Sequence, residues 1–124
     1  MARWAMQPTL VNAYYSGALN TIALPAAWVQ DPYMTQYVPT GVNYGGVGTL
    51  IGHELAHSID NGHINFDIYG RFFRWDYQSY QTYEQRKNCL GYEYSKFAFD
   101  VTDRYGNLIK LNGWQTMGEN MADN

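Results

Sequence analysis

The sequence has 124 residues, of which 46% are hydrophobic and 15% are charged, so its composition argues against a disordered chain. A net charge of −3, with no block of Lys or Arg, argues against a nucleic-acid-binding protein. No apolar run reaches the roughly 18 residues that would span a bilayer, and the first ten residues lack the apolar centre of a signal peptide. Membrane attachment is therefore expected only through a segment outside this chain.

The N-terminal third is predicted to contain two short strands followed by a loop. Residues 9–15 and 20–24 are rich in β-branched and aromatic side chains, and the residues between them favour a turn. Three prolines within residues 25–44 favour a loop there, with a short helix near Ala26–Val29.

The clearest predicted helix runs from about Gly46 to Asn61. Ile51, Leu55 and Ile59 recur at i, i+4 and i+8, which is the spacing of an apolar stripe on one face of a helix. The polar residues of the same segment fall on roughly the opposite side.

The second half of the chain is predicted to be mostly helical. Residues 63–73 resemble a turn-rich loop or hairpin, and Asp76 to Phe99 have the 3–4 spacing of a long helix. Residues 104–113 suggest a loop or short hairpin, and Thr116 to Asn124 suggest a further helix. The expected fold class is α+β, with short edge strands before the three helices. We expect the C-terminal portion of the domain to lie beyond Asn124.

The segment His53-Glu54-Leu55-Ala56-His57 fits the metal-binding pattern H-E-x-x-H. Residues at i and i+4 of a helix share one face, so both imidazoles can reach one metal ion. Glu54 would lie beside the metal, where it could take a proton from a metal-bound water. The alternative is a surface helix with two hydrogen-bonded histidines and a glutamate in an ion pair.

A catalytic zinc ion usually has three protein ligands and one open position, so a third ligand is expected from another element. Glu119 is the candidate, and Asp123, at i+4 on the same helical face, could accept a ring N–H from a ligand histidine. The alternative is that both are solvated acids on a surface helix. Asp60, at i+3 from His57, is equally consistent with a similar supporting role and with an ordinary helix end.

Four segments together resemble the catalytic core of the neprilysin family, which includes the endothelin-converting enzymes. They are VNAYY, LPAAW, NYGGVGTLIGHELAHSID and GENMADN, and the resemblance extends from about Trp4 to Asn124. It implies a gluzincin-type core that binds one Zn²⁺ per chain through His53, His57 and Glu119. It also implies that Glu54 is the catalytic base and that Asp123 orients a ligand histidine.

The resemblance also implies a substrate-binding strand and a side-chain pocket. Asn12 and Ala13 match the family's edge strand, which would bind the backbone of an extended peptide. The positions similar to the pocket of relatives could equally be packed in the core; they are Trp28, Tyr33, Thr49 and Leu50.

Some features of the family have no counterpart in this sequence. The family's oxyanion-stabilising histidine and substrate-gripping arginine would lie downstream of Asn124, and His63 does not match that role, so it is interpreted as a loop residue. Cys89 matches a position whose disulfide partner in relatives lies upstream of this chain. We therefore expect residues 1–124 to be part of a neprilysin-like catalytic domain, and to be inactive when isolated.

The predicted function is zinc-dependent endopeptidase chemistry on short peptides, through a metal-bound water activated by Glu54. The resemblance implies a cell-surface ectodomain of a type II membrane protein, or a secreted enzyme. One alternative is a catalytically inactive homologue or fragment with a structural or binding role. Glu54 argues against it, because a purely structural zinc site needs no base. Another alternative is a thermolysin-like secreted protease.

Overall fold

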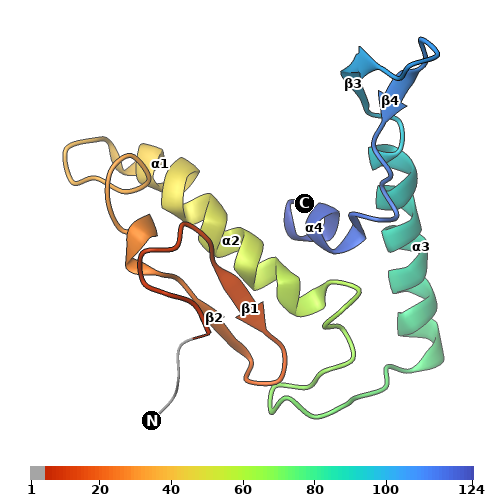
Figure 1. Ribbon diagram of the computed structural model, residues 1–124. Coiled ribbons are helices and arrows are strands. Elements are labelled where there is room, and N and C mark those ends of the chain that lie inside the picture. The colour runs from red at the N-terminus through yellow and green to blue at the C-terminus, as the bar shows by residue number, and fades with distance from the viewer. Residues whose placement is uncertain (1–4) are drawn as a thin grey trace.

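The computed structural model describes residues 5–124, so Trp4, where the resemblance begins, lies outside the described residues. The chain forms two separate two-stranded antiparallel hairpins and a set of helices, which confirms the predicted α+β class (Figure 1). Within residues 5–124, no helix is long and apolar enough to cross a membrane.

The first hairpin pairs β1 (Tyr14–Ser16) with β2 (Thr21–Ala23). Both predicted strands are present, but each is only three residues long. The first begins late because the chain makes a turn before it, in which Leu10 N–H donates to the carbonyl of Gln7 at 3.0 Å. The turn that joins the strands carries Asn20 at a φ of 46°, a conformation that asparagine adopts more readily than most residues.

The HExxH helix follows the loop and the short 3₁₀ helix η1 (Ala26–Trp28) that the sequence predicts. It is built from four consecutive helical segments: α1 (Thr40–Asn43), the π-helical η2 (Tyr44–Gly48), α2 (Thr49–Ala56) and the 3₁₀ helix η3 (His57–Ile59). Its predicted bounds were wrong at both ends. It starts earlier, directly after Pro39, whose fixed φ suits a helix start, and it ends where Asp60 becomes extended.

A kink in this helix lies at Gly46, whose φ of −89° and ψ of −105° are not helical. The carbonyl of Tyr33 approaches the helix here and accepts a hydrogen bond from Val47 N–H at 3.1 Å. A Cβ atom on Gly46 would lie 2.5 Å from that carbonyl oxygen, so this close approach requires glycine.

The long helix α3 (Tyr77–Tyr94) begins at Asp76, whose side chain accepts from Ser79 N–H at 2.9 Å and caps the first turn. The predicted end at Phe99 was wrong by five residues. Residues 98–99 instead open strand β3 (Ala98–Thr102), which pairs with β4 (Leu108–Lys110) in a hairpin that projects from the end of α3 (Figure 1). The alternating sequence of β3 and the turn at Gly106, with a φ of 84°, favour the hairpin over a longer helix.

The last helix, α4 (Met117–Ala122), packs against both α2 and α3 (Figure 1). Met117 and Ala122 are buried, and the buried Asn120 side chain donates to the carbonyl of Gly113 at 2.9 Å. This contact fixes the start of α4 to the turn before it. α4 lies against the polar face of α2, where Glu119 and Asp123 meet His53.

The apolar stripe of the HExxH helix remains largely open in this chain. Leu55 and Ile59 are more than half exposed, and Ile51 is half-buried. The side of α2 that contacts β1 and α4 carries its polar residues instead. Within the described residues, this helix therefore packs mainly through its polar side and not through its apolar stripe.

Candidate metal centre

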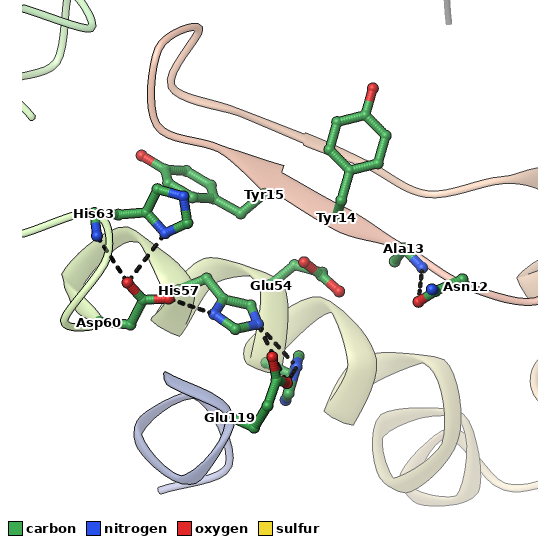
Figure 2. Close-up of a pocket in the computed structure, with 10 residues that line it drawn as sticks. Asn12, Ala13, Tyr14, Tyr15, Glu54, His57, Asp60, His63 and Glu119 are labelled. Carbon is green, nitrogen blue, oxygen red and sulfur yellow. Dashed lines mark hydrogen bonds and ion pairs between the residues drawn. The ribbon is translucent and has the colours of Figure 1, made fainter. Parts of the chain in front are cut away.

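Three side chains, two from the HExxH helix and one from α4, converge on one point, and Figure 2 labels two of them, His57 and Glu119. His53 of α2 and His57 at the start of η3 face each other, with their Nε2 atoms 3.1 Å apart. Glu119 of α4 places Oε2 3.3 Å from His53 Nε2 and 3.7 Å from His57 Nε2. The helical spacing of the histidines and the packing of α4 on α2 produce this convergence.

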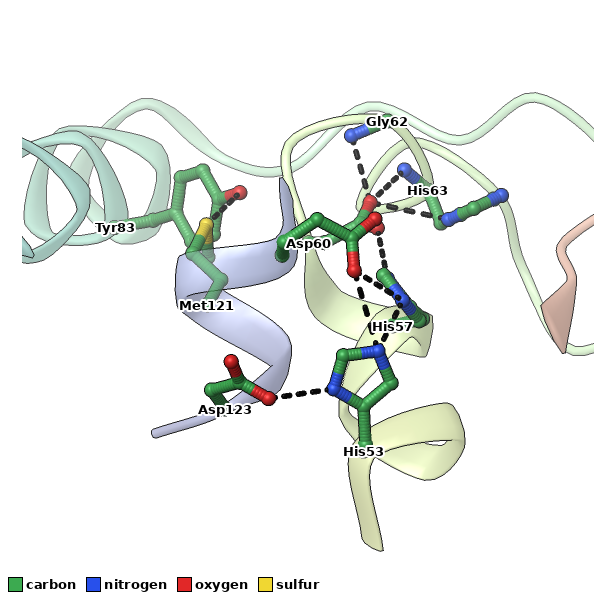
Figure 3. Close-up of polar contacts among 9 residues, drawn as sticks. His53, His57, Asp60, Gly62, His63, Tyr83, Met121 and Asp123 are labelled. Atoms are coloured by element: carbon green, nitrogen blue, oxygen red, sulfur yellow. Dashed lines mark hydrogen bonds and ion pairs between the residues drawn. The ribbon is translucent and has the colours of Figure 1, made fainter. Parts of the chain in front are cut away.

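Two carboxylates hold the other nitrogens of these rings. Asp123 Oδ1 lies 2.7 Å from His53 Nδ1, and Asp60 Oδ2 lies 2.7 Å from His57 Nδ1 (Figure 3). An ionised carboxylate can only accept hydrogen bonds, so both rings carry a proton on Nδ1. In the neutral rings, the two Nε2 lone pairs then point toward each other and toward the Glu119 carboxylate.

This arrangement fits a divalent metal ion. Three acceptor atoms in mutual contact repel each other unless a cation lies between them. Zinc bonds to histidine nitrogen of about 2.0–2.1 Å in a tetrahedron place neighbouring ligand atoms about 3.3 Å apart. The separations of 3.1, 3.3 and 3.7 Å bracket that value. The described residues that form the cluster supply three ligands, the number typical of a catalytic zinc site.

Glu54 lies beside this cluster and is almost fully buried. Burial raises its pKa, an effect that the nearby His57 and His53 oppose and Glu119 reinforces. Its Oε2 has no hydrogen-bond partner among the described residues. An unpartnered buried carboxylate oxygen is costly in a folded protein, and a water molecule at the neighbouring site would satisfy it.

The buried carboxylate of Asp60 accepts hydrogen bonds from several donors at once. Burial alone would raise its pKa, but hydrogen bonds from His57, Gly62 and His63 outweigh that effect and hold the pKa below its usual value. Its Oδ1 accepts from Gly62 N–H at 2.7 Å and from His63 N–H at 2.8 Å. The sequence left two interpretations of Asp60, a helix end or a support for a ligand histidine. In the structure both apply, because Asp60 ends the helix and orients His57.

A cleft of about 320 Å³ lies between β1 and the HExxH helix, with the three converging side chains at its wall (Figure 2). Asn12 and Ala13 line it just before β1 begins, and the Asn12 side chain accepts from Ala13 N–H at 2.8 Å. Tyr14, Tyr15 and His63 line it too. The sequence interpretation missed these three, because only the spatial approach of β1 to the helix end marks them.

The four candidate pocket residues lie elsewhere. Trp28 and Tyr33 pack edge to face with ring centroids 4.3 Å apart, and Thr49 donates to the carbonyl of Gly45 at 3.0 Å. The half-buried Leu50 is likewise not among the residues that line the cleft. The structure favours local packing for Trp28 and Tyr33, whereas Thr49 is exposed. Cys89 is exposed on α3.

Comparison with known proteins gives a consistent result. Residues 12–124 match the model of peptidase family M13. The chain is 36% identical to human membrane metallo-endopeptidase-like 1 and to human neprilysin over 122 residues, and 37% identical to mouse endothelin-converting enzyme 1 over 123 residues. Each alignment covers 98% of this chain but only 15–16% of the relative, so the chain spans about a sixth of their length.

Solved structures agree. The chain is similar to PepO from Lactobacillus rhamnosis, with 36% identity and a TM-score of 0.84, and to the inhibitor complex of zinc metalloprotease Zmp1 from Mycobacterium tuberculosis, with 33% identity and a TM-score of 0.90. Both matches cover 98% of this chain and 18–19% of the solved chain. Together with the cluster of His53, His57 and Glu119, these matches show that the chain belongs to peptidase family M13, a family of zinc metallopeptidases.

Proposed function

We propose that this chain supplies the zinc-binding catalytic core of an endopeptidase that hydrolyses peptide bonds in short peptides. The observation that carries the proposal is the convergence of His53, His57 and Glu119 beside the unpartnered oxygen of Glu54. A structural zinc site would have no use for a buried carboxylate at that position, which argues against an inactive homologue.

The two histidines and Glu119 would hold one Zn²⁺, with Asp123 and Asp60 keeping the imidazole rings in the required tautomer. When bound, zinc lowers the pKa of a coordinated water toward 7. Glu54 would accept the proton of that water as it attacks the peptide carbonyl, and would pass the proton to the departing amine nitrogen. The raised pKa of Glu54 suits the first transfer, because a carboxylate with a raised pKa is a stronger base toward the proton of the water.

The edge of β1 opposite β2 would bind the substrate backbone. The backbone N–H of Tyr15 lies near the Glu54 carboxylate and lowers its pKa, so Tyr15 presents its backbone to the edge of β1 that faces the cleft. In an extended chain residue i−2 faces the same edge, which brings Ala13 to it as well. An extended peptide could pair there by β-augmentation, with the Asn12 amide as a further donor and acceptor.

We also propose that residues 1–124 form part of the catalytic domain of a longer peptidase. The support is that the chain aligns over nearly all of its length to about a sixth of each relative. A relative named as a membrane metallo-endopeptidase favours action at the cell surface or outside the cell.

Substitution of Glu54 by Gln in the protein at its full natural length tests the proposal. The amide is nearly isosteric but cannot accept the proton, so zinc content should remain near one ion per chain while turnover falls by about 10²-fold or more. Glu93→Gln, the same substitution on the exposed face of α3, is the matched control and should be neutral. A Glu54→Gln enzyme within about tenfold of wild type would show that Glu54 is not the base.

A further inference from the structure

His63 lies in the loop after the HExxH helix and reaches the carboxylate that holds His57. Its Nδ1 lies 3.0 Å from Asp60 Oδ1, while Asp60 Oδ2 lies 2.7 Å from His57 Nδ1 (Figure 3). The two imidazoles therefore contact opposite oxygens of one carboxylate. Because that carboxylate is ionised and only accepts, His63 donates from Nδ1.

The ring of His63 is fixed from its other side by β1. The Tyr15 ring packs edge to face against it, with centroids 5.1 Å apart (Figure 2). Gly17 leaves room for it, since a Cβ atom there would lie 2.7 Å from His63 Cδ2. His63 thus occupies a slot between the cleft strand and the helix end, and its orientation is set by a hydrogen bond and by packing.

The carboxylate of Asp60 is buried, with only 6% of its side chain exposed, so water has little access to replace a lost donor. Its Oδ1 has three donors, and the His63 ring is the only one of them that is a side chain. The two backbone donors come from the turn that follows the helix. The ring adds a bond whose direction is anchored to β1, outside that turn.

We propose that His63 is a positioning residue of the metal centre, which orients Asp60 and through it the His57 ring. This inference rests on the proposed metal site. His57, Asp60 and His63 also have donor atoms close enough to hold a metal ion of their own. Both ring nitrogens that face Asp60 carry protons, however, and His57 already belongs to the first cluster. The hydrogen-bonded arrangement therefore describes this trio better than a second metal site.

Two variants separate the hydrogen bond from the packing. His63→Phe keeps a ring against Tyr15 and removes the donor. His63→Asn removes the ring and keeps an N–H at the position of Nδ1. The readout is the zinc dissociation constant, measured by competition with a chromophoric chelator in the protein at its full natural length. The visible absorption of the Co²⁺-substituted protein reports the ligand geometry independently.

We expect His63→Phe to bind zinc about threefold to tenfold more weakly. This is the loss of affinity expected when one hydrogen bond is removed from Asp60, which in turn holds the ligand His57. We expect His63→Asn to stay within about twofold of wild type. Thermal unfolding with chelator present reports folding, and if His63→Phe does not fold, His63→Gln replaces it, since Gln lacks a donor at the Nδ1 position.

Zinc binding by His63→Phe equal to wild type would overturn the proposal, as would an Asn variant as weak as the Phe variant. In both cases the proposed catalytic function would stand. A wild-type protein that binds no zinc at this site would overturn the function and this inference together.

Discussion

Asparagine at position 60 should damage the metal centre through a change of tautomer. The Asp60 carboxylate accepts the Nδ1 proton of His57 at 2.7 Å. In Asp60→Asn, the amide oxygen keeps the position of Oδ1, because it must still accept from Gly62 N–H and His63 N–H. The amide NH₂ then takes the position of Oδ2 and faces His57. His57 must then accept at Nδ1 and carry its proton on Nε2, the nitrogen that faces the metal. A metal ion can bind there only after that proton moves.

The size of the effect follows from burial. Loss of a carboxylate behind a metal-bound histidine typically costs about 10- to 100-fold in metal affinity, or about 1.4–2.7 kcal/mol. Asp60 should lie near the upper end, because its side chain is only 6% exposed and water cannot take its place. Asp123, which holds His53 in the same way, has a side chain that is 61% exposed. Its Asn variant should therefore lie near the lower end.

The pair Asp60→Asn and Asp123→Asn is matched, because each removes one negative charge beside one ligand histidine. Zinc affinity of both, measured by chelator competition, gives the comparison directly. An Asp123→Asn loss equal to or larger than that of Asp60→Asn would refute the argument from burial. A loss for Asp123→Asn as large as that for Glu119→Ala would instead make Asp123 a direct ligand.

Three further predictions concern the ligands, the kink and acid stability. Alanine at any one of the three ligand positions should reduce zinc below one ion per chain by elemental analysis; unchanged content would remove that residue from the ligand set. These positions are His53, His57 and Glu119. Gly46→Ala should destabilise the fold in urea by about 1–3 kcal/mol, because the new Cβ meets the Tyr33 carbonyl, while Gly45→Ala, with open space around it, should not. The folded-state pKa of Asp60 lies below the unfolded value, so its ionisation stabilises the fold above about pH 4 and is lost as pH falls through the folded pKa. Wild-type Tm, measured with chelator present, should therefore fall more steeply in acid than that of Asp60→Asn; parallel curves would contradict this.

The converging side chains were predictable where local geometry sets their positions. The i, i+4 spacing brings His53 and His57 together on any helix, whatever the rest of the fold. Glu119 could be assigned only by its motif. It lies 62 residues after His57 in the sequence, and it reaches the two histidines only because α4 packs against α2. The fold class followed from the same local patterns.

The misassigned features depend on contacts distant in sequence. The end of α3 was placed too late because the helical spacing persists past Tyr94, and only pairing with β4 shows that Ala98 begins a strand. The exposure of Leu55 could not follow from the periodicity of its own helix. His63 does lie in a loop, as predicted, but its contacts with Asp60 and Tyr15 could not be predicted, because these residues meet it only after the turn has formed.

The packing of α4 across α2 has a consequence for how this protein unfolds. A metal ion held by His57 and Glu119 links two points 62 residues apart, and so acts as a removable crosslink between the β1–α2 half and the α3–α4 half of the chain. Closing a loop of that length restricts the unfolded chain by about 4 kcal/mol in the loop-entropy treatment used for disulfides. Chelation would remove this restraint without breaking a covalent bond, and the association of the two halves would then depend more strongly on the packing of α4 against α2 and η3.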